Sequence, residues 1–489
     1  MRRLSPIMLA GTGSDVGKSL IATGLCRIFR QDGYNPAPFK AQNMALNSYA
    51  TPDGFEIGRA QAVQAEAAGI NCSTDMNPIL LKPSGEHTSQ VVLNGRPSGD
   101  TVAYQYFRKE GKDELRKIAH DAFDRLERRY NPIVLEGAGS VSELNLREGD
   151  IVNMSMAEYA GANVVLVADI DRGGVFASVY GSIMLQTPEH RKLIKGIIIN
   201  KFRGDLRLFQ DGRKLLEQIS GIPVLGVVPM ATHIHIDEED SVALAGKDKK
   251  SASGRINVAV VLLKHISNFT DFNVLERHPE VNLYYASTPG DIAEADIIIL
   301  PGSKNTLADL LDLRKRGVAK TILEAREKGK TVIGICGGYQ MMGKEVCDPD
   351  GIEGDLKFLP GLGLLPIETV MSGHKTTKQV KFRFMEDERT CEGYEIHMGR
   401  TETSRPFIWR EDGTAEGCMV DERCFGSYVH GILDNAAVID FILKPFLNKR
   451  DIDDFDPSAY RQRQYDLLAD WLREYVDIPR IYKIMTTND

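Results

Sequence analysis

The segment Gly11–Ser19, with the sequence Gly-Thr-Gly-Ser-Asp-Val-Gly-Lys-Ser, limits the fold more than any other part of this 489-residue chain. It follows the short apolar run Ile7–Ala10 and precedes a stretch with helical periodicity. A glycine-rich turn between a strand and a helix directs backbone N–H groups and a helix N-terminus toward one point, an arrangement suited to phosphate. The sequence therefore predicts a phosphate-binding loop in a parallel α/β sheet.

The side chains of this loop predict its ligands. Lys18 is placed to neutralise the β- and γ-phosphates of ATP, and the Ser19 hydroxyl is placed to ligate Mg²⁺. A threonine stands at position 12, where the usual pattern has glycine, and this variant resembles the loop of dethiobiotin synthetase and its relatives. The alternative is a glycine-rich turn without a ligand, but the lysine and serine argue against it. The other predicted ATP-binding residues of the loop are Thr12, Gly13, Val16 and Gly17.

Three polar residues at predicted strand ends extend this site. Glu136 follows the run Ile133–Leu135, where a carboxylate faces the ligand crevice of an open sheet, and it resembles the Mg²⁺-binding glutamate of the same relatives. Lys40 ends the second strand, and the resemblance places it at the reacting phosphate, whereas a solvated surface lysine is the alternative. Asn200 is predicted to read the adenine edge, with a helix-capping role as the alternative.

The first half of the chain alternates short β-branched runs with amphipathic segments such as Gly58–Ala68 and Asp113–Arg129. Runs of this kind are typical of buried parallel strands, so residues 1–235 are predicted to form a doubly wound ATP-binding domain. The polar, charged stretch 236–255 is interpreted as a linker. The predicted strands are Ile7–Ala10, Ile133–Leu135, Val164–Ala168, Ile197–Ile199 and Val224–Val228.

A second α/β series begins at Asn257, and residues 256–447 are predicted to form a second domain. Residues 448–489 are charged with scattered aromatics and are interpreted as a helical appendage to which the sequence assigns no chemistry. The predicted strands of the second domain are Val258–Leu262, Leu283–Ala286, Ile297–Leu300, Val332–Ile335 and Phe425–Val429.

Cys336 lies at a strand-to-helix junction in this second domain, between the run Thr331–Ile335 and two glycines. A thiol at such an elbow lies beside helix N–H groups that favour the thiolate. His430 ends another predicted strand, and a cysteine activated by a distant histidine is typical of acyl-transferring thiol enzymes. A buried core cysteine and a core histidine are the structural alternatives. The surrounding glycines argue against the first, and the pairing with Cys336 argues against the second.

The segment Leu300–Asn305 ends a further strand, and Gly302 and Gly337 are predicted to contribute N–H groups to an oxyanion hole. The combination resembles class I glutamine amidotransferase domains, which usually carry a glutamate two residues after the histidine to orient its ring. Here that position is Ile432. This departure matches the cobyrinic and cobyric acid synthase branch, and the resemblance implies a Cys–His pair without an acid at that position.

A phosphate-loop domain followed by a glutaminase domain implies that ATP activates a carboxylate and that ammonia from glutamine converts it to an amide. Further stretches resemble the cobyric acid synthases and extend the resemblance from about residue 5 to about residue 435. They are Phe39–Met44, Asn77–Pro83, Ala168–Ala177, Asn200–Asp205, Ile266–Phe272 and Gly393–Arg400.

The resemblance implies adenosylcobyrinic acid a,c-diamide as the corrinoid substrate, with ATP, Mg²⁺ and L-glutamine. The b, d, e and g carboxylates would be amidated to give adenosylcobyric acid. The segment Asp169–Arg172 is either a turn with surface ion pairs or a contact to substrate carboxylates or Mg²⁺, and the second is favoured. His397 and Arg400 are expected to shape the glutamine pocket or a domain interface.

Charge and composition exclude other classes of protein. The net charge of −8 gives no basic stripe of the kind that nucleic-acid binders carry. No apolar run reaches the length of a membrane span, and the cysteines contain no Cys-x-x-Cys pair. We therefore expect a cytoplasmic enzyme without disulfide bonds, zinc, nucleic acid or membrane contacts. The sequence leaves a homo-oligomer open.

Two other functions compete with this one. A cobyrinic acid a,c-diamide synthase would have the same layout and chemistry, and the Ala168–Ala177 and Lys40–Met44 stretches argue against it. A nucleotide-switched partition or scaffold ATPase related to MinD would have an inactive second domain, and the intact Cys336 and His430 argue against it. The sequence leaves the order of amidation and the path of ammonia undetermined.

Overall fold

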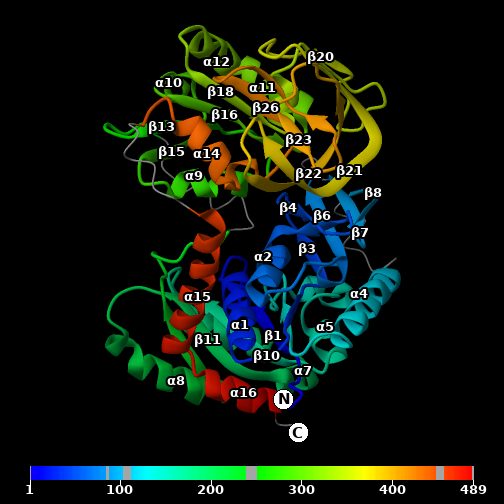
Figure 1. Cartoon of the computed structure of the whole chain (residues 1–489). Helices are drawn as coiled ribbons and strands as arrows, with labels where there is room; N and C mark the ends of the chain where they lie inside the picture. Colours follow the sequence, from blue (N-terminus) through cyan, green and yellow to red (C-terminus); the bar gives the residue numbers. More distant parts are fainter. Residues whose placement is uncertain (1, 84–87, 103–111, 238–249, 448–455, 487–489) are drawn as a thin grey trace. The chain divides into compact units, whose positions relative to one another are not determined.

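The computed structural model describes residues 2–83, 88–102, 112–237, 250–447 and 456–486. The chain forms two compact units, each built from segments that are discontinuous in sequence (Figure 1). Unit 1 consists of Met1–Met44, Ile57–Asp237 and Arg461–Asp489, and unit 2 consists of Ala45–Glu56 and Glu238–Tyr460.

Short β-branched runs form the central parallel sheet of unit 1, in the order β12-β11-β10-β1-β9-β2. β9 and β10 flank β1, so the carboxyl ends of these strands lie at the switch point where open α/β sheets bind ligands. The strands are β1 (Ile7–Gly11), β2 (Ala37–Phe39), β9 (Ile133–Glu136), β10 (Asn163–Asp169), β11 (Ile194–Phe202) and β12 (Val224–Pro229).

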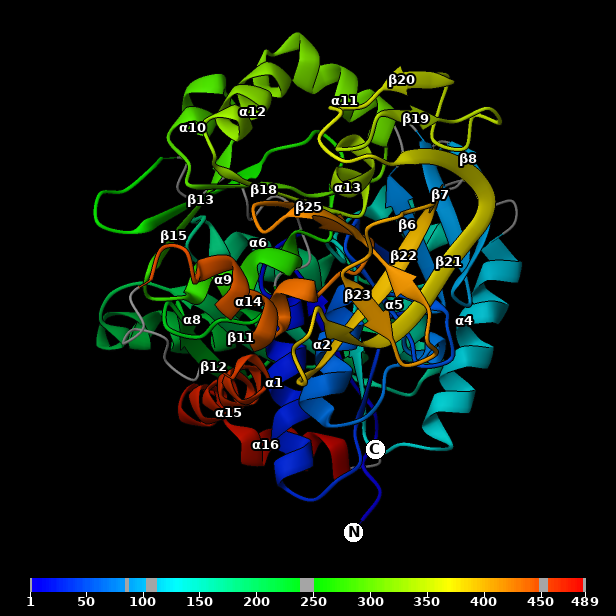
Figure 2. The same cartoon turned by 45° about the horizontal axis from the view of Figure 1, so that its top comes forward.

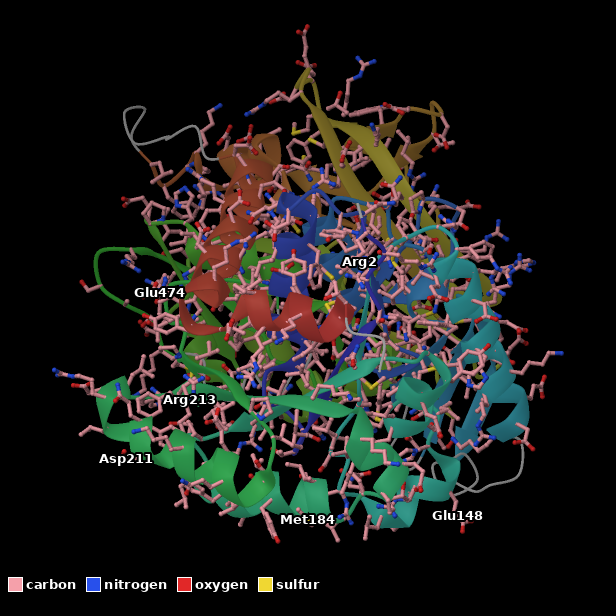
Figure 3. The ribbon with its side chains drawn as sticks, turned by 90° about the horizontal axis from the view of Figure 1, so that it is seen from below. Arg2, Glu148, Met184, Asp211, Arg213 and Glu474 are labelled. Atoms are coloured by element: carbon pink, nitrogen blue, oxygen red, sulfur yellow. The ribbon has the colours of Figure 1, made fainter. Side chains whose placement is uncertain are left out.

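Helices cover the sheet of unit 1, as the doubly wound pattern predicts (Figures 1 and 2). Charged side chains lie on the outer side of α8 (Gln210–Ser220), and Figure 3 shows Asp211 and Arg213 pointing away from that helix. The helices are α1 (Lys18–Gln31), α2 (Arg59–Ala68), α4 (Lys112–Glu127), α5 (Met154–Tyr159), α6 (Val175–Met184), α7 (Pro188–Leu193) and α8 (Gln210–Ser220).

A small separate sheet has the order β3-β6-β7-β8, with β3 (Gln42–Met44), β6 (Ile79–Pro83), β7 (Thr88–Leu93) and β8 (Arg96–Val102).

The C-terminal segment packs into the core of unit 1. Leu472 of α15 (Pro457–Tyr475) approaches α1 so closely that a Cβ on Gly24 would lie 2.3 Å from its Cδ1. Ile481 of α16 (Ile478–Thr486) is fully buried in the same hydrophobic cluster. Arg27 of α1 also pairs with Asp466 at 2.7 Å. The expected appendage 448–489 therefore contributes, from Arg461 onward, to the ATP-binding unit.

The main sheet of unit 2 has the order β15-β13-β16-β18-β26-β25, parallel except for β25. Together with unit 1 it confirms the predicted fold class. The strands are β13 (Ile256–Val261), β15 (Val281–Ala286), β16 (Ile297–Leu300), β18 (Thr331–Ile335), β25 (Cys418–Asp421) and β26 (Cys424–Ser427). The helices are α9 (Asn273–Arg277), α10 (Pro289–Ala293), α11 (Thr306–Lys315), α12 (Val318–Glu327), α13 (Gly337–Met341) and α14 (Ala436–Leu443).

A second sheet of unit 2 is centred on the long antiparallel pair β21 (Glu368–Phe384) and β22 (Thr390–Thr401). The segment 45–56, from the first half of the sequence, packs against β22: Tyr49 and Tyr394 lie with their ring centroids 4.5 Å apart. The sequence placed the segment 45–56 in the ATP-binding domain 1–235, whereas in the structure it belongs to unit 2. Of the expected linker 236–255, residues 238–249 lie outside the described residues. No helix among the described residues is long and apolar enough to cross a membrane.

Candidate active sites

The phosphate loop of unit 1 joins β1 to α1, because β1 ends at Gly11 and α1 begins at Lys18. Gly17 adopts φ 93°, and a Cβ there would lie 2.1 Å from Nδ2 of Asn200, so this position requires glycine. Thr12, at the departure from the usual pattern, donates its backbone N–H to the carbonyl of Val167 at 3.0 Å. This backbone bond, which a glycine could also make, joins the loop to the neighbouring strand.

Lys18 is buried and reaches back across the loop. Its Nζ donates to the carbonyl oxygens of Gly13 at 3.1 Å and Gly139 at 3.0 Å. The ammonium group is therefore held over the glycine-rich turn, at the place where polyphosphate binds in loops of this kind.

Glu136 brings three of the predicted side chains together. Its Oε1 accepts hydrogen bonds from Ser19 Oγ at 2.8 Å and Lys40 Nζ at 2.9 Å, and its Oε2 accepts one from Gln64 Nε2 at 2.7 Å. Burial raises the pKa of this carboxyl, but the Lys40 charge and the three hydrogen bonds outweigh burial and hold the pKa below its usual range. The sequence reasoning missed Gln64, whose only signal is a glutamine within the alanine-rich helix α2.

Asn200 lies behind the loop. Its side chain is buried, and Nδ2 donates to the carbonyl of Val16 at 2.9 Å. Asp169, in the segment predicted to contact substrate, pairs with Lys201 at 3.3 Å, while Arg172 pairs with Asp15 at 2.9 Å. These charges pair with one another, and a substrate contact by this segment stays a prediction.

Cys336 occupies the elbow between β18 and α13 with φ 51° and ψ −108°, a conformation that is strained for a residue with a side chain. The turn is tight: a Cβ on Gly338 would lie 1.9 Å from the carbonyl oxygen of Leu300. The thiol lies 3.7 Å from the carbonyl oxygen of Ile396. This geometry fits the predicted nucleophile elbow.

His430 lies between a thiol and a carboxylate. Its Nδ1 is 2.7 Å from Oδ2 of Asp271, and its ring also hydrogen-bonds Cys336. Asp271 also accepts the N–H of Gly431 at 3.0 Å, and both side chains are 2% exposed. Burial lowers the pKa of the His430 imidazolium, but the charges and hydrogen bonds of Asp271 and Cys336 outweigh burial and raise it to about 10.

The structure therefore supplies an acid where the sequence predicted a Cys–His pair alone. Ile432, at the usual position of that acid, is buried and apolar. The carboxylate comes instead from Asp271, 159 residues before His430. A signal was present, because Asp271 lies in the Ile266–Phe272 stretch that carries part of the family resemblance. The spacing gave no reason to pair the two residues.

Gly302 and Gly337, the predicted oxyanion residues, lie close to one another, since Gly337 approaches Ser303, the residue after Gly302. A Cβ on Gly302 would lie 3.2 Å from Cε1 of His430, and one on Gly337 would lie 2.7 Å from the backbone N of Ser303. Both positions thus exclude larger residues because other groups of the site approach them closely. Gly302 belongs to β17 (Gly302–Ser303), which pairs with β14 (Ile266–Ser267) on the way to Asp271.

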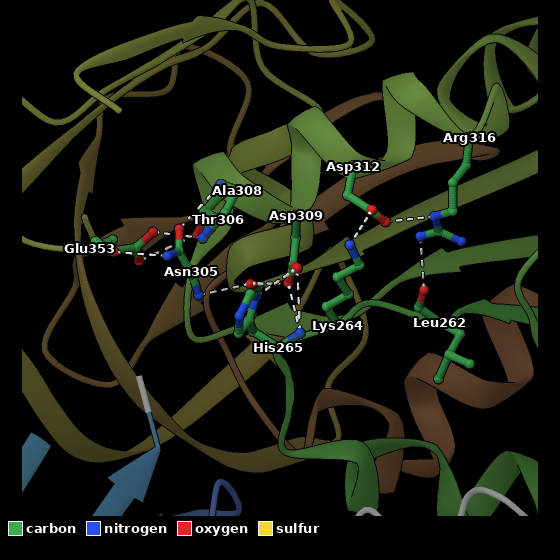
Figure 4. Close-up of polar contacts among 11 residues, drawn as sticks. Leu262, Lys264, His265, Asn305, Thr306, Ala308, Asp309, Asp312, Arg316 and Glu353 are labelled. Atoms are coloured by element: carbon green, nitrogen blue, oxygen red, sulfur yellow. Dashed lines mark hydrogen bonds and ion pairs between the residues drawn. The ribbon is translucent and has the colours of Figure 1, made fainter. Parts of the chain in front are cut away.

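A buried carboxylate holds these two short strands. Oδ2 of Asp309 accepts the Ser303 hydroxyl at 2.6 Å, and Oδ1 lies 2.9 Å from Nδ1 of His265 (Figure 4). Hydrogen bonding to Asp309 raises the pKa of His265. Figure 4 also shows Glu353 reaching the start of α11, where its Oε2 accepts the N–H of Thr306 at 2.6 Å. These contacts position the strand that carries Gly302.

His397 belongs to the surroundings of this site. Its ring stacks on that of Tyr428 with centroids 3.8 Å apart, and its Nδ1 lies 2.8 Å from the carbonyl of Gly399. His397 follows Ile396, whose carbonyl faces the thiol. Arg400 is exposed on β22 and pairs with Val370 of β21. The predicted roles of His397 and Arg400 in the glutamine pocket stay predictions.

Comparison with known proteins gives the family of each half of the chain. Residues 7–242 match the model of the CobQ/CobB/MinD/ParA nucleotide binding domain, and residues 257–438 match that of the CobB/CobQ-like glutamine amidotransferase domain. The chain is 63% identical over 493 residues to the cobyric acid synthase of Bacteroides fragilis, with 100% of both chains covered. It is also 63% identical over 494 residues to that of Phocaeicola vulgatus, again with 100% of both covered.

More distant relatives carry the same name. The cobyric acid synthase of Syntrophobacter fumaroxidans is 47% identical over 515 residues, with 99% of each chain covered. Identity at this level over the whole length, together with a phosphate loop in one unit and a cysteine–histidine site in the other, shows that this chain belongs to the cobyric acid synthase family, the glutamine-hydrolysing ligases of cobalamin biosynthesis.

Proposed function

We propose that this chain uses ATP and L-glutamine to amidate the b, d, e and g carboxylates of adenosylcobyrinic acid a,c-diamide, giving adenosylcobyric acid. One observation carries the proposal: the same chain holds Lys18 over a phosphate loop and aligns Cys336, His430 and Asp271 in a buried relay. The two sites lie in separate units, so each performs one half of the reaction.

The glutaminase half follows from the positions of the side chains. The Cys336 thiolate attacks the amide carbon of glutamine, and the oxyanion that forms is stabilised by N–H groups of the Gly302 and Gly337 segments. The His430 imidazolium then protonates the departing nitrogen, so that ammonia leaves and a glutamyl thioester remains. Neutral His430 next removes a proton from water, which attacks the thioester and releases glutamate.

Asp271 supports this sequence through His430. A carboxylate 2.7 Å from Nδ1 fixes the ring orientation and leaves Nε2 directed to the thiol. It also stabilises the imidazolium form, in accord with the raised pKa of about 10. The ring therefore carries the proton that the leaving nitrogen needs at neutral pH.

The synthetase half activates a carboxylate. A corrinoid carboxylate oxygen attacks the γ-phosphorus of ATP, the bond to the bridging oxygen breaks, and ADP leaves with that electron pair. Lys18 and Lys40 neutralise charge on the transferred phosphoryl group. Ammonia then attacks the acyl phosphate carbon, phosphate departs, and an amide forms. Asn200 is proposed to hydrogen-bond adenine, because its side-chain amide oxygen can accept a hydrogen bond from the exocyclic amino group of the base.

Mg²⁺ fits the residues at this site. The Ser19 hydroxyl and the Glu136 carboxylate, 2.8 Å apart, are hard oxygen donors of the kind that Mg²⁺ selects. The ion would neutralise phosphate charge. No group of three or more His, Cys, Asp or Glu side chains among the described residues forms a separate metal cage. This agrees with an ion held largely by phosphate and water.

A mass-resolved product assay tests the proposal. The chain, ATP, Mg²⁺ and glutamine would be supplied with the a,c-diamide or, separately, with cobyrinic acid. We expect four successive amidations of the a,c-diamide, each seen as the replacement of a hydroxyl by an amino group. Amidation confined to the a and c positions of cobyrinic acid would instead identify a diamide synthase.

A further inference from the structure

Two consecutive residues at the end of β11 hold two consecutive carbonyl groups of the phosphate loop. Asn200 Nδ2 donates to the carbonyl of Val16 at 2.9 Å, and Lys201 Nζ donates to the carbonyl of Asp15 at 2.5 Å. Lys201 also pairs with the carboxylates of Asp15 at 3.4 Å and Asp169 at 3.3 Å. Its ammonium group therefore joins the loop to the ends of β10 and β11.

The backbone at this contact adopts an uncommon conformation. Asp15 has φ 57° and Lys201 has φ 59°, both in the left-handed region that residues with side chains rarely occupy. Such conformations persist where surrounding contacts hold them. Here the two strained residues hold each other, through the bond from the Lys201 ammonium to the Asp15 carbonyl.

Peptide geometry gives this contact a consequence for phosphate binding. In a planar trans peptide, the carbonyl and the N–H of the following residue point in opposite directions. With the Asp15 carbonyl held by Lys201, the Val16 N–H points to the other side of the loop. Because Asn200 holds the Val16 carbonyl, the Gly17 N–H also points to that other side of the loop. These N–H groups belong to the set that cradles phosphate in a loop of this type.

We propose that Asn200 and Lys201 form a clamp that fixes the phosphate loop with its N–H groups turned toward the polyphosphate of the nucleotide. Lys201 acts as a positioning residue through the Asp15 carbonyl. Asn200 has the same role at Val16, in addition to any contact with adenine. This inference rests on ATP binding at the loop, and it assigns nucleotide affinity to residues outside the loop itself.

The experiment measures the affinity of the full chain for ADP and for adenosine by calorimetry. Lys201→Met should weaken ADP binding about tenfold or more, because a charge-assisted hydrogen bond that orders the loop is lost. Adenosine, which has no phosphate for the loop to bind, should bind as to the wild type. Arg203→Met is the matched control: Arg203 is two residues away, is 62% exposed and pairs with Asp171, so its removal should leave both affinities unchanged.

Three results would overturn the clamp: unchanged ADP binding by Lys201→Met, an equal loss for adenosine, or the same loss from Arg203→Met, which would indicate only long-range charge. If Lys201→Met does not fold, Lys201→Arg gives the same test, with a smaller loss expected for ADP alone. Lys18→Met separates the two proposals. If it loses ADP binding while Lys201→Met does not, the phosphate loop stands and the clamp fails.

Discussion

The phosphate loop of unit 1 and the relay of Cys336, His430 and Asp271 in unit 2 are assembled from the chain in different ways. The loop Gly11–Ser19 is contiguous, and the phosphate binding proposed for it depends mainly on backbone N–H groups that a local turn directs. The relay joins Asp271, Cys336 and His430 from three separate segments through their side chains. A contiguous backbone motif can be read from a sequence, whereas the partners of a side-chain relay are set by the fold.

The largest expected effect removes the nucleophile of the relay. Cys336→Ala should abolish amidation that depends on glutamine, because no other thiol lies at the elbow of α13. A high concentration of ammonia at mildly alkaline pH should restore amide formation, since unit 1 still activates the carboxylate. Amide product with glutamine and with ammonium would be compared by mass. Unimpaired use of glutamine by the variant would remove Cys336 from the mechanism.

Loss of the loop cation should produce the converse result. Lys18→Met should reduce amidation about a hundredfold or more, with either nitrogen source, because charge on the transferred phosphoryl group is no longer neutralised. Glutamine hydrolysis by unit 2, measured as glutamate released, should persist. Rescue of this variant by ammonia would contradict the division of labour between the two units.

The third prediction concerns the acid that the sequence did not reveal. Asp271→Asn should lower glutaminase activity by about two to four orders of magnitude, because the neutral asparagine side chain no longer stabilises the His430 imidazolium or holds its ring in the same orientation. Asp271 and Cys336 together outweigh burial and raise the pKa of His430 to about 10, so loss of the Asp271 carboxylate should move the alkaline limb of the pH–rate profile to lower pH. The stability that the pair contributes is complete below pH 6.5 and is lost as pH rises through about 10.

A second variant makes this test specific to position. Ile432→Glu places an acid at the position usual in class I amidotransferases, and in the Asp271→Asn background it should give no recovery. Ile432 is 2% exposed in the hydrophobic core, so a carboxylate there is expected to cost stability. Full activity of Asp271→Asn with an unmoved alkaline limb would show that His430 works without the acid.

The sequence predicted most of what depends on local pattern. The strands that carry site residues, the loop and the cysteine elbow follow from short apolar runs and from the glycine-rich turns after β1 and β18. Ser19 and Glu136 were predicted together as Mg²⁺ ligands and Lys40 as a residue at the reacting phosphate, and the structure joins Ser19 and Lys40 to the Glu136 carboxylate. Gln64 and Asp271 were missed, because neither lies at a spacing that indicates a partner more than seventy residues away. The packing of residues 461–486 into unit 1 was missed for the same reason.

A smaller effect is expected from the carboxylate behind the oxyanion strand. Asp309→Asn should lower glutaminase activity by about tenfold or less, because the Ser303 hydroxyl keeps an acceptor but the ion pair with His265 is lost. The loss should appear in kcat with little change in KM, since the strand that carries Gly302 is proposed to act on the oxyanion of the transition state. Ammonia-dependent amidation is the internal control and should stay unchanged. A loss as large as that of Asp271→Asn would place Asp309 in the relay itself.

The smallest effect tests Glu353, another carboxylate of unit 2 with a partner distant in sequence. Burial raises the pKa of Glu353 to about 7 from the model-compound value of 4.5, against the lowering effect of the Thr306 N–H and the charge of Lys304. Between these two values the folded state retains a proton that the unfolded state has released, so stability falls as pH rises through this window. The glutamine in Glu353→Gln cannot ionise, so the stability of this variant should decrease less than that of the wild type as pH rises through this window.

Melting temperatures at about pH 5 and about pH 8 measure the difference, and the decrease should be smaller in Glu353→Gln than in the wild type by about 2 °C. Glu388→Gln, a substitution of an exposed glutamate on unit 2, is the matched control and should melt like the wild type at both values. Glu353 accepts the N–H of Thr306 at the start of α11, three residues after the oxyanion strand ends. A decrease equal to that of the wild type would show that the Glu353 carboxyl does not keep a raised pKa in the folded protein, and that it is ionised throughout this pH range.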